Sequence, residues 1–330
     1  MQVRDEIYGE QRIVEPVLQE LIKSAAVQRL RYINQAGALK YTTPHATVTR
    51  YEHSIGVLIL LQRLGASLKE QIAGLLHDVP HTAFSHVVDY ALDVQGHDFH
   101  EQHHQRILEQ SNIPRILEKH GFNIKDFLDV EKYSLLEQPA PALCADRIDY
   151  TLRDTQIIRR VDMRKYLDYF TTHNGRVVMT DAQAASAFAK EYMQSDKHIW
   201  ANPREGAAYN LLANALRQAL STGLISKQDL WMTDDELFAI LDRSSDEVIQ
   251  QNLHLLNRNL EVEVSEEESD FVDQAKMRYI NPPVKTAQGV LLASELDEQL
   301  LQAIQKHREW HAKEKPVRIR RYERLLDAKK

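Results

Sequence analysis

The sequence IAGLLHDVPHTAFSH occupies residues 72–86 and joins an apolar run to several ionisable side chains. The run at 72–76 has the composition of a buried helix, and it ends in the doublet His77-Asp78. Burying an imidazole beside a carboxylate costs free energy unless hydrogen bonds or a shared cation compensate for it. Because Pro80 disfavours helical geometry at the residue before it, we expect the chain to turn directly after the doublet. The stretch therefore predicts a helix end that presents metal ligands in a hydrolytic site.

Composition indicates an ordinary globular protein with a large core. The chain has 330 residues, 43% hydrophobic and 27% charged, with a net charge of −7 and only 11 Gly and 10 Pro. The single cysteine, Cys144, excludes an intramolecular disulfide and a cysteine-based zinc site, and it fits a reducing compartment. We find neither an apolar signal-peptide run nor the roughly 18 apolar residues of a membrane span. We therefore expect a cytoplasmic protein without a membrane partner.

The periodicity of apolar residues predicts a mainly helical chain. The clearest strand signal is the Asn-Gly turn in 173–179, which predicts a small hairpin. The fold class is therefore all-α, with that hairpin and short extended segments in the C-terminal half. We divide the chain into a catalytic core at 1–170 and a helical elaboration at 171–330. We expect helices at 13–37, His53 to about Leu64, 68–78, about 82–92, 100–120, 126–135, from about Ala142, 181–195 and 204–221, a loop at 38–49, an acidic loop or strand edge at 261–270, and an extended segment at 278–284.

Four dispersed side chains form the candidate metal site: His53, His77, Asp78 and Asp146. Imidazole and carboxylate together suit Mn, Fe, Mg, Ni or Zn, and four protein ligands of this kind leave positions open for water and substrate. Because a carboxylate beside a ligand histidine can bridge to a second ion, one or two divalent metals per site are compatible with this set.

Three blocks in this order resemble those of the HD-domain phosphohydrolases: YEHSIGV at 51–57, LLHDVPHTAFSH at 75–86 and ADRIDY at 145–150. An upstream box, QRLRYINQAG at 28–37, makes the resemblance greatest to the branch of deoxynucleoside-triphosphate triphosphohydrolases. The resemblance covers about residues 5–160. It implies that the four side chains bind the metal and that the protein is a homo-oligomer.

The resemblance also implies catalytic roles for five neighbours. His81 would reach substrate phosphates or a metal-bound water. His86 would protonate the leaving oxygen, oriented by Asp89 three residues later. His100 and Glu101 match a further active-site pair. A carboxylate beside an imidazole raises its pKa toward 7, which suits proton transfer near neutral pH.

Substrate contacts are implied for six more residues. Two arginines would neutralise phosphate charge, and the others would surround the sugar, with Gln35 at its 3′-hydroxyl. The chain departs from the branch at Ala36, where a bulkier apolar residue is common, so exclusion of a 2′-hydroxyl should be weaker. The six residues are Gln35, Ala36, Arg50, Arg147, Tyr150 and Asp154.

The leading functional interpretation is a metal-dependent hydrolase that converts a dNTP to deoxynucleoside and triphosphate. One alternative is a phosphomonoesterase or phosphodiesterase acting on another nucleotide. A second is a non-catalytic, metal-stabilised module that binds a partner or nucleic acid through its basic tail at 306–330, where Lys and Arg outnumber acids. No feature of the sequence requires a nucleic-acid partner.

Overall fold

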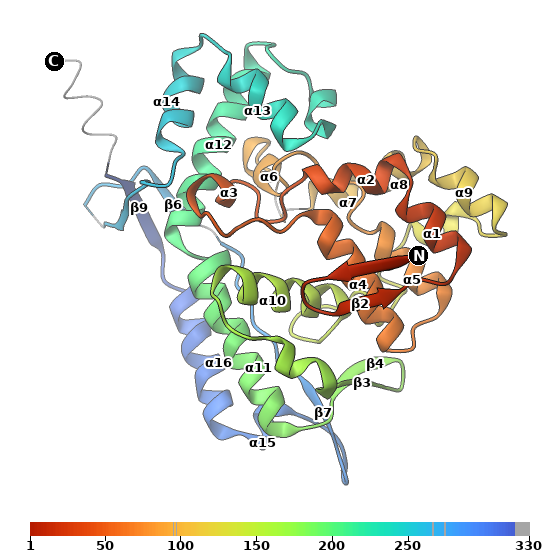
Figure 1. Cartoon of the computed structure of the whole chain (residues 1–330). Coiled ribbons are helices and arrows are strands. Elements are labelled where there is room, and N and C mark those ends of the chain that lie inside the picture. Colours follow the sequence, from red (N-terminus) through yellow and green to blue (C-terminus); the bar gives the residue numbers. More distant parts are fainter. Residues whose placement is uncertain (95, 97, 266, 274, 321–330) are drawn as a thin grey trace.

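The structure is a computed structural model that describes residues 1–94, 96, 98–265, 267–273 and 275–320. It is mainly helical, with small sheets at its periphery (Figure 1), which confirms the predicted fold class. Among the described residues, none of the helices combines the length and apolarity that a bilayer crossing needs.

The helices of the first 160 residues surround the candidate site. They are α1 (Pro16–Ile22), α2 (Ala25–Arg29), η1 (Leu30–Tyr32), α3 (Leu39–Thr42), α4 (Arg50–Arg63), α5 (Leu68–Leu76), α6 (Val87–Ala91), α7 (Phe99–Gln102), α8 (His104–Glu109), α9 (Ile113–Lys119), η2 (Ile124–Phe127) and α10 (Ala145–Ile158).

The helices of the remaining chain cover one side of that group (Figure 1). They are η3 (Arg164–Tyr169), α11 (Ala182–Ser195), the π-helical turn η4 (Asp196–Trp200), α12 (Pro203–Ser221), η5 (Lys227–Trp231), α13 (Asp234–Asp242), α14 (Glu247–Leu255), α15 (Ala293–Leu296) and α16 (Glu298–His311).

Three small sheets complete the fold. The first is the antiparallel pair β1 (Gln2–Asp5) and β2 (Gly9–Arg12). The second has the order β3-β4-β7-β8, from β3 (Phe170–His173), β4 (Arg176–Met179), β7 (Pro283–Thr286) and β8 (Gly289–Leu292). The third has the order β5-β9-β6, from β5 (Val262–Val264), β9 (Lys315–Ile319) and β6 (Phe271–Asp273).

The predicted hairpin at 173–179 is confirmed as β3 and β4, which pair in antiparallel register. Asn174 and Gly175 both have positive φ, 49° and 73°, as the tight turn between them requires. The expected strand edge at 261–270 contains β5, and the extended segment at 278–284 leads into β7. Part of the basic tail forms the end of α16 and β9, whereas residues 321–330 lie outside the described residues.

Helix α4 begins at Arg50, three residues before the start that we expected. A capping box sets this start, because the Thr49 hydroxyl accepts from the Glu52 amide at 3.2 Å while the Glu52 carboxylate accepts from the Thr49 amide at 2.7 Å. The earlier start places Arg50 and His53 three residues apart within one helix, so that both side chains leave the same face.

Helix α5 ends at Leu76, and His77 is its C-cap. The turn that follows contains two residues in left-handed geometry, Phe84 (φ 60°) and Ser85 (φ 52°). Because an α-helix cannot continue through such residues, the helix expected at 82–92 is shortened to α6.

The helices expected at 13–37 are present as the short α1, α2 and η1. Two other expectations were wrong. Helix α3 lies inside the expected loop at 38–49. The stretch 126–135 is largely turns instead of a helix. There, the buried Glu70 carboxylate accepts from the amides of Leu135 and Leu136 at 2.7 and 3.2 Å, a tertiary contact that takes the place of helical hydrogen bonds.

The main core extends across residue 170. One buried cluster contains Leu152 of α10, Phe188 of α11 and Val284 of β7, so both predicted parts contribute to it. A second cluster joins α12 to α6 and to α14. The division at residue 170 stays a prediction about chain organisation. What matters for the site is that α4 packs against both α5 and α10.

Candidate metal centre

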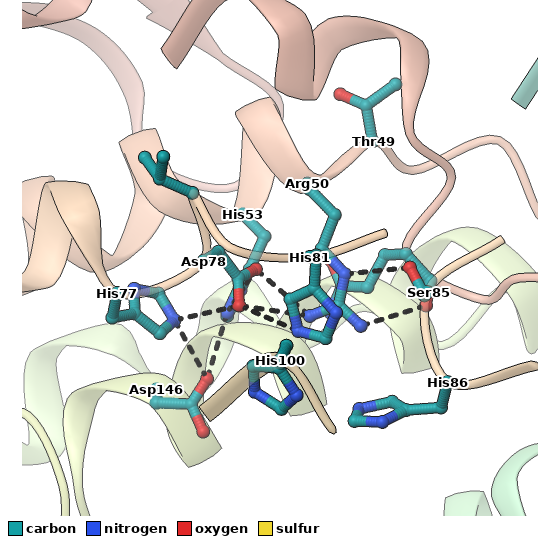
Figure 2. A network of polar contacts seen from close by, with 12 residues as sticks. Thr49, Arg50, His53, His77, Asp78, His81, Ser85, His86, His100 and Asp146 are labelled. Carbon is teal, nitrogen blue, oxygen red and sulfur yellow. Dashed lines mark hydrogen bonds and ion pairs between the residues drawn. The ribbon is translucent and has the colours of Figure 1, made fainter. Parts of the chain in front are cut away.

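The packing of α4, α5 and α10 brings the four candidate ligands together (Figure 2). His53 lies in α4, His77 and Asp78 follow α5, and Asp146 lies in the first turn of α10. His53 Nε2 is 2.9 Å from Asp146 Oδ1 and 3.9 Å from Asp78 Oδ2. His77 Nε2 is 3.6 Å from Asp146 Oδ1 and 3.5 Å from Asp78 Oδ1. Residues separated by 93 positions therefore share one small space.

The hydrogen bonds of the two imidazoles fit a metal ion. The Nδ1–H of His77 donates to the Gly74 carbonyl at 2.7 Å, and the Nδ1–H of His53 donates to Asp149 at 2.8 Å. Both Nε2 atoms then carry lone pairs that face the carboxylates. His77 Nε2 is buried and has no hydrogen-bond partner among the described residues. Since such an atom is satisfied by a cation, the four side chains fit a divalent metal.

The charges point the same way. Burial lowers the pKa of His53, but hydrogen bonds to Asp146 and Asp149 outweigh burial and raise the pKa to about 10. The pKa of His77 is also raised, by the Asp78 and Asp146 carboxylates against the opposing effect of burial. The site therefore favours additional positive charge, which either protons or a metal cation can supply.

Asp149, to which we assigned no role from the sequence, supports the ligand His53. Its carboxylate also accepts from Arg153 Nε at 2.7 Å, and Arg153 Nη2 donates to Asp5 at 2.6 Å. All of these side chains are at most 3% exposed. Asp149 thus holds His53 in one tautomer and orientation, and the N-terminal strand β1 is tied to the metal site through Arg153.

The guanidinium of Arg50 is held by side chains of the protein itself. Its Nη1 lies 3.0 and 3.2 Å from the two oxygens of Asp78, and its Nε donates to the Ser85 hydroxyl at 3.0 Å. The buried guanidinium holds the pKa of Asp78 well below its usual range despite burial, which acts in the opposite direction. His81 Nε2 is 3.2 Å from the same carboxylate. Arg50 therefore fixes a ligand and places positive charge at the centre.

Three histidines form a second group beside the ligands (Figure 2). The rings of His81 and His100 stack with centroids 3.8 Å apart, and the ring of His86 meets them edge-on at 5.0 and 5.3 Å. Burial lowers the pKa of His81 well below its usual range and that of His100 to about 3, so these two imidazoles are neutral. His86, whose side chain is 31% exposed, is the most exposed of the three.

The expected partner of His86 is in place, because its Nδ1 lies 2.9 Å from Asp89 Oδ2. The other oxygen of Asp89 accepts from the Phe99 amide at 3.0 Å, which fixes the carboxylate. Glu101 is different: its carboxylate is 69% exposed and 3.9 Å from His100. The structure therefore orients His86 and leaves Glu101 at the edge of the group.

The six residues expected to contact substrate differ in whether their polar atoms already have hydrogen-bond partners within the protein. Tyr150 shares a 2.6 Å hydrogen bond with Tyr192, and Asp154 Oδ2 accepts from the Trp200 indole at 2.8 Å. Asp154 Oδ1 and Gln35 Oε1 are buried without a hydrogen-bond partner among the described residues. Ala36 is half-buried, and its carbonyl accepts from Tyr209 at 3.2 Å.

The side chain of Arg147 points toward backbone carbonyl groups of the protein. Its guanidinium donates to the carbonyls of Gln138 and Ala142 at 3.1 and 2.6 Å. The aromatic residues Tyr192, Trp200 and Tyr209 were missed by sequence reasoning. They come from the C-terminal half without a motif, so only the packing of α11, η4 and α12 reveals them.

Known proteins resemble this chain to different extents. Residues 50–154 match the family model described as HD domain. The uncharacterized protein YdhJ of Bacillus subtilis is 43% identical over 288 residues, 86% of this chain and 88% of that protein. The metal-dependent phosphohydrolase cns2 of Cordyceps militaris is 40% identical over 246 residues, 72% of this chain and 71% of that protein. The deoxynucleoside triphosphate triphosphohydrolase SAMHD1 of Bos taurus is 39% identical over 102 residues, 26% of this chain and 17% of that protein.

We expect Asp149→Asn to weaken metal binding by about 10- to 100-fold. The side chain would lose its negative charge and one of the two oxygens that accept from His53 and Arg153, so His53 would be oriented less firmly. Competition with a chelator, followed by elemental analysis of the protein, measures the affinity. The exposed Asp242, changed to Asn, is the matched control and should retain wild-type affinity. Equal metal affinity in both variants would contradict the role of Asp149.

We expect Gly56→Ala to destabilise the fold by roughly 2–4 kcal/mol. A Cβ at this position would lie 2.0 Å from both Arg153 Nη2 and Asp149 Oδ1 and would force that buried ion pair apart. Urea unfolding followed by circular dichroism measures the change. Arg63→Ala, in an exposed position of the same helix, should change stability by less than about 0.5 kcal/mol. A Gly56 variant as stable as this control would refute the packing argument.

Proposed function

This chain belongs to the HD-domain family of metal-dependent phosphohydrolases, and on that premise we propose that it hydrolyses a dNTP to deoxynucleoside and triphosphate. The observation that carries the proposal is a pair of buried oxygens, Asp154 Oδ1 and Gln35 Oε1, that find no hydrogen-bond partner in the described part of the chain. Sugar hydroxyls are donors that would satisfy both. The similarity to SAMHD1, although short, supports the same substrate class.

The reaction would add water to the α-phosphorus and break its bond to the sugar 5′-oxygen. A divalent cation held by His53, His77, Asp78 and Asp146 would supply Lewis-acid polarisation of the phosphate and of the attacking water. His86, oriented by Asp89, would donate the proton that the departing 5′-oxygen takes up. The one ring N–H of neutral His81 donates to Asp78, so His81 would help to hold that ligand. Neutral His100 would offer a ring N–H to a phosphate oxygen, while Arg50 would add fixed positive charge.

Cation, assembly and location complete the proposal. We propose that Mn²⁺ supports the reaction, since a set of imidazoles and carboxylates accommodates it as well as Fe, Mg, Ni or Zn. We also propose a cytoplasmic homo-oligomer as the active form.

A second candidate is a phosphomonoesterase acting on another nucleotide. The observation that favours it is the engagement of Arg147 by backbone carbonyls, which leaves one cation fewer to neutralise a triphosphate. The relative cns2, similar over most of both chains, bears only the general description of a metal-dependent phosphohydrolase.

An activity panel distinguishes the two candidates. We expect the protein with Mn²⁺ to release tripolyphosphate from at least one dNTP in a panel of dNTPs, NTPs, nucleoside monophosphates and cyclic nucleotides, with products separated by ion-exchange chromatography. His86→Ala should lower kcat by about 10²–10⁴-fold, because the leaving oxygen loses its proton donor.

The control for this loss is His254→Ala, a change at an exposed histidine of α14, which should leave kcat unchanged. Orthophosphate release from a monophosphate, without tripolyphosphate from any dNTP, would replace the leading proposal by the second candidate. Full activity of the His86 variant would remove that residue from the mechanism.

The proposed role of Asp154 predicts a stability cost. Burial raises the pKa of Asp154 from 3.8 to about 6, so keeping it ionised in the folded state costs free energy above that pH. The folded state binds the proton more tightly than the unfolded state, so this group contributes less stability as pH rises from about 4 to 6. We expect Asp154→Asn to stabilise the protein by roughly 1–3 kcal/mol at pH 8 and by little at pH 4.

Thermal unfolding at the two pH values measures the effect, and Asp242→Asn serves as the exposed control. A loss of stability at pH 8 would show that the carboxylate is a structural acceptor instead of a group held ionised for a ligand.

A further inference from the structure

A second group of metal-ligand side chains lies away from the motifs of the HD domain. It consists of Asp196, His307 and His311, whose ligand atoms all lie within 4.8 Å of one another. His307 and His311 are four residues apart in α16 and therefore lie on one face of that helix. Asp196 is the first residue of the π-helical turn η4, directly after α11. Helices α11 and α16 run side by side (Figure 1).

The donor atoms converge on one point. His307 Nε2 is 2.9 Å and His311 Nε2 is 2.5 Å from the same oxygen, Asp196 Oδ2. The carbonyl oxygen of Arg278 is 3.0 Å from His307 Nε2 and offers a further ligand. The side chains of Asp196 and His307 are at most 1% exposed, and that of His311 is 6% exposed. Two imidazole nitrogens and two oxygens thus meet at one buried point.

Hydrogen bonding alone leaves this group incompletely satisfied. Both imidazoles donate to one carboxylate oxygen, while Asp196 Oδ1 is buried and has no hydrogen-bond partner among the described residues. A cation held by both oxygens of the carboxylate would engage the orphaned atom as well. Buried polar atoms without partners indicate an absent ion or water more often than a tolerated loss.

The catalytic ligands show comparable spacings. There, His53 Nε2 and Asp146 Oδ1 are 2.9 Å apart, which equals the separation between His307 Nε2 and Asp196 Oδ2. Around a tetrahedral zinc ion, ligand atoms at about 2.0–2.2 Å from the metal are separated by roughly 3.3 Å, so small side-chain shifts open either site. His311 also lines a surface hollow of about 500 Å³, so this side of the group lies next to solvent.

We propose that Asp196, His307 and His311 bind a second divalent cation of the Zn²⁺ type, separate from the catalytic metal. Two imidazoles with a carboxylate suit Zn²⁺ and its late first-row neighbours. The ion would join α16 to the end of α11 across 111 residues of sequence. The turn η4 that it holds ends at Trp200, whose indole donates to Asp154. The site is therefore structural, and it fixes the position of Trp200 near the candidate substrate residue Asp154.

Cobalt titration tests the site in isolation from catalysis. The full chain carrying His77→Ala and Asp146→Asn, which lacks two catalytic ligands, is titrated with Co²⁺ and with Zn²⁺. We expect about one equivalent to bind, with the visible absorption of four- or five-coordinate cobalt. Adding His311→Ala should abolish that equivalent and its absorption, whereas adding the exposed His254→Ala should leave both unchanged.

Circular dichroism of each variant verifies folding, and Asp196→Asn, which keeps the side-chain volume, repeats the test should His311→Ala unfold. Zn²⁺ should also raise the Tm of the His77→Ala/Asp146→Asn chain but not that of the same chain with Asp196→Asn. The proposal is overturned by absence of cobalt binding in the first chain, or by an unchanged stoichiometry after either substitution. Both readouts are independent of whether any nucleotide is hydrolysed.

Discussion

The buried carboxylate of Asp149, held between His53 and Arg153, is the interaction on which the centre depends. It accepts a hydrogen bond from His53, a candidate metal ligand of α4, and forms an ion pair with Arg153 of its own helix α10. Arg153 in turn donates to Asp5 of β1. Three segments far apart in sequence are thereby fixed at one point without solvent. A buried charge is stable only when it is paired and hydrogen-bonded. Each residue of this hydrogen-bonded network therefore requires the others.

The same charge balance assigns different tasks to similar side chains. His53 and His77 face carboxylates, which raise their pKa, so their Nε2 atoms favour a cation. Burial lowers the pKa of His81 and of His100, with the charge of Arg50 adding to the effect on His81 and that of His86 to the effect on His100, so both are neutral. His86, more exposed and paired with Asp89, is the member placed to exchange a proton. Environment, not residue type, distinguishes ligand, neutral donor and proposed acid.

Local sequence predicted those elements whose hydrogen bonds are local. The Asn-Gly hairpin and helices α11 and α12 formed close to where periodicity and turn chemistry placed them. The helix predicted at 126–135 does not form, because Glu70, 65 residues before Leu135, supplies the acceptor that a helix would have supplied. Helix α6 is shorter than predicted because Phe84 and Ser85 adopt left-handed backbone conformations, which these residue types do not favour.

The sequence by itself indicated the candidate metal ligands, because the blocks that contain His53, the His77-Asp78 doublet and Asp146 resemble those of the HD-domain phosphohydrolases, and that resemblance implies that these side chains bind the metal. It determined the mainly helical class as well, since apolar periodicity is a local property. Only the tertiary structure decided that Asp149 supports His53, that Arg147 faces backbone carbonyls, and that Asp196 meets two histidines 111 and 115 residues away. Such contacts depend on how helices pack, and no spacing along the chain encodes the partner that a buried polar group will find.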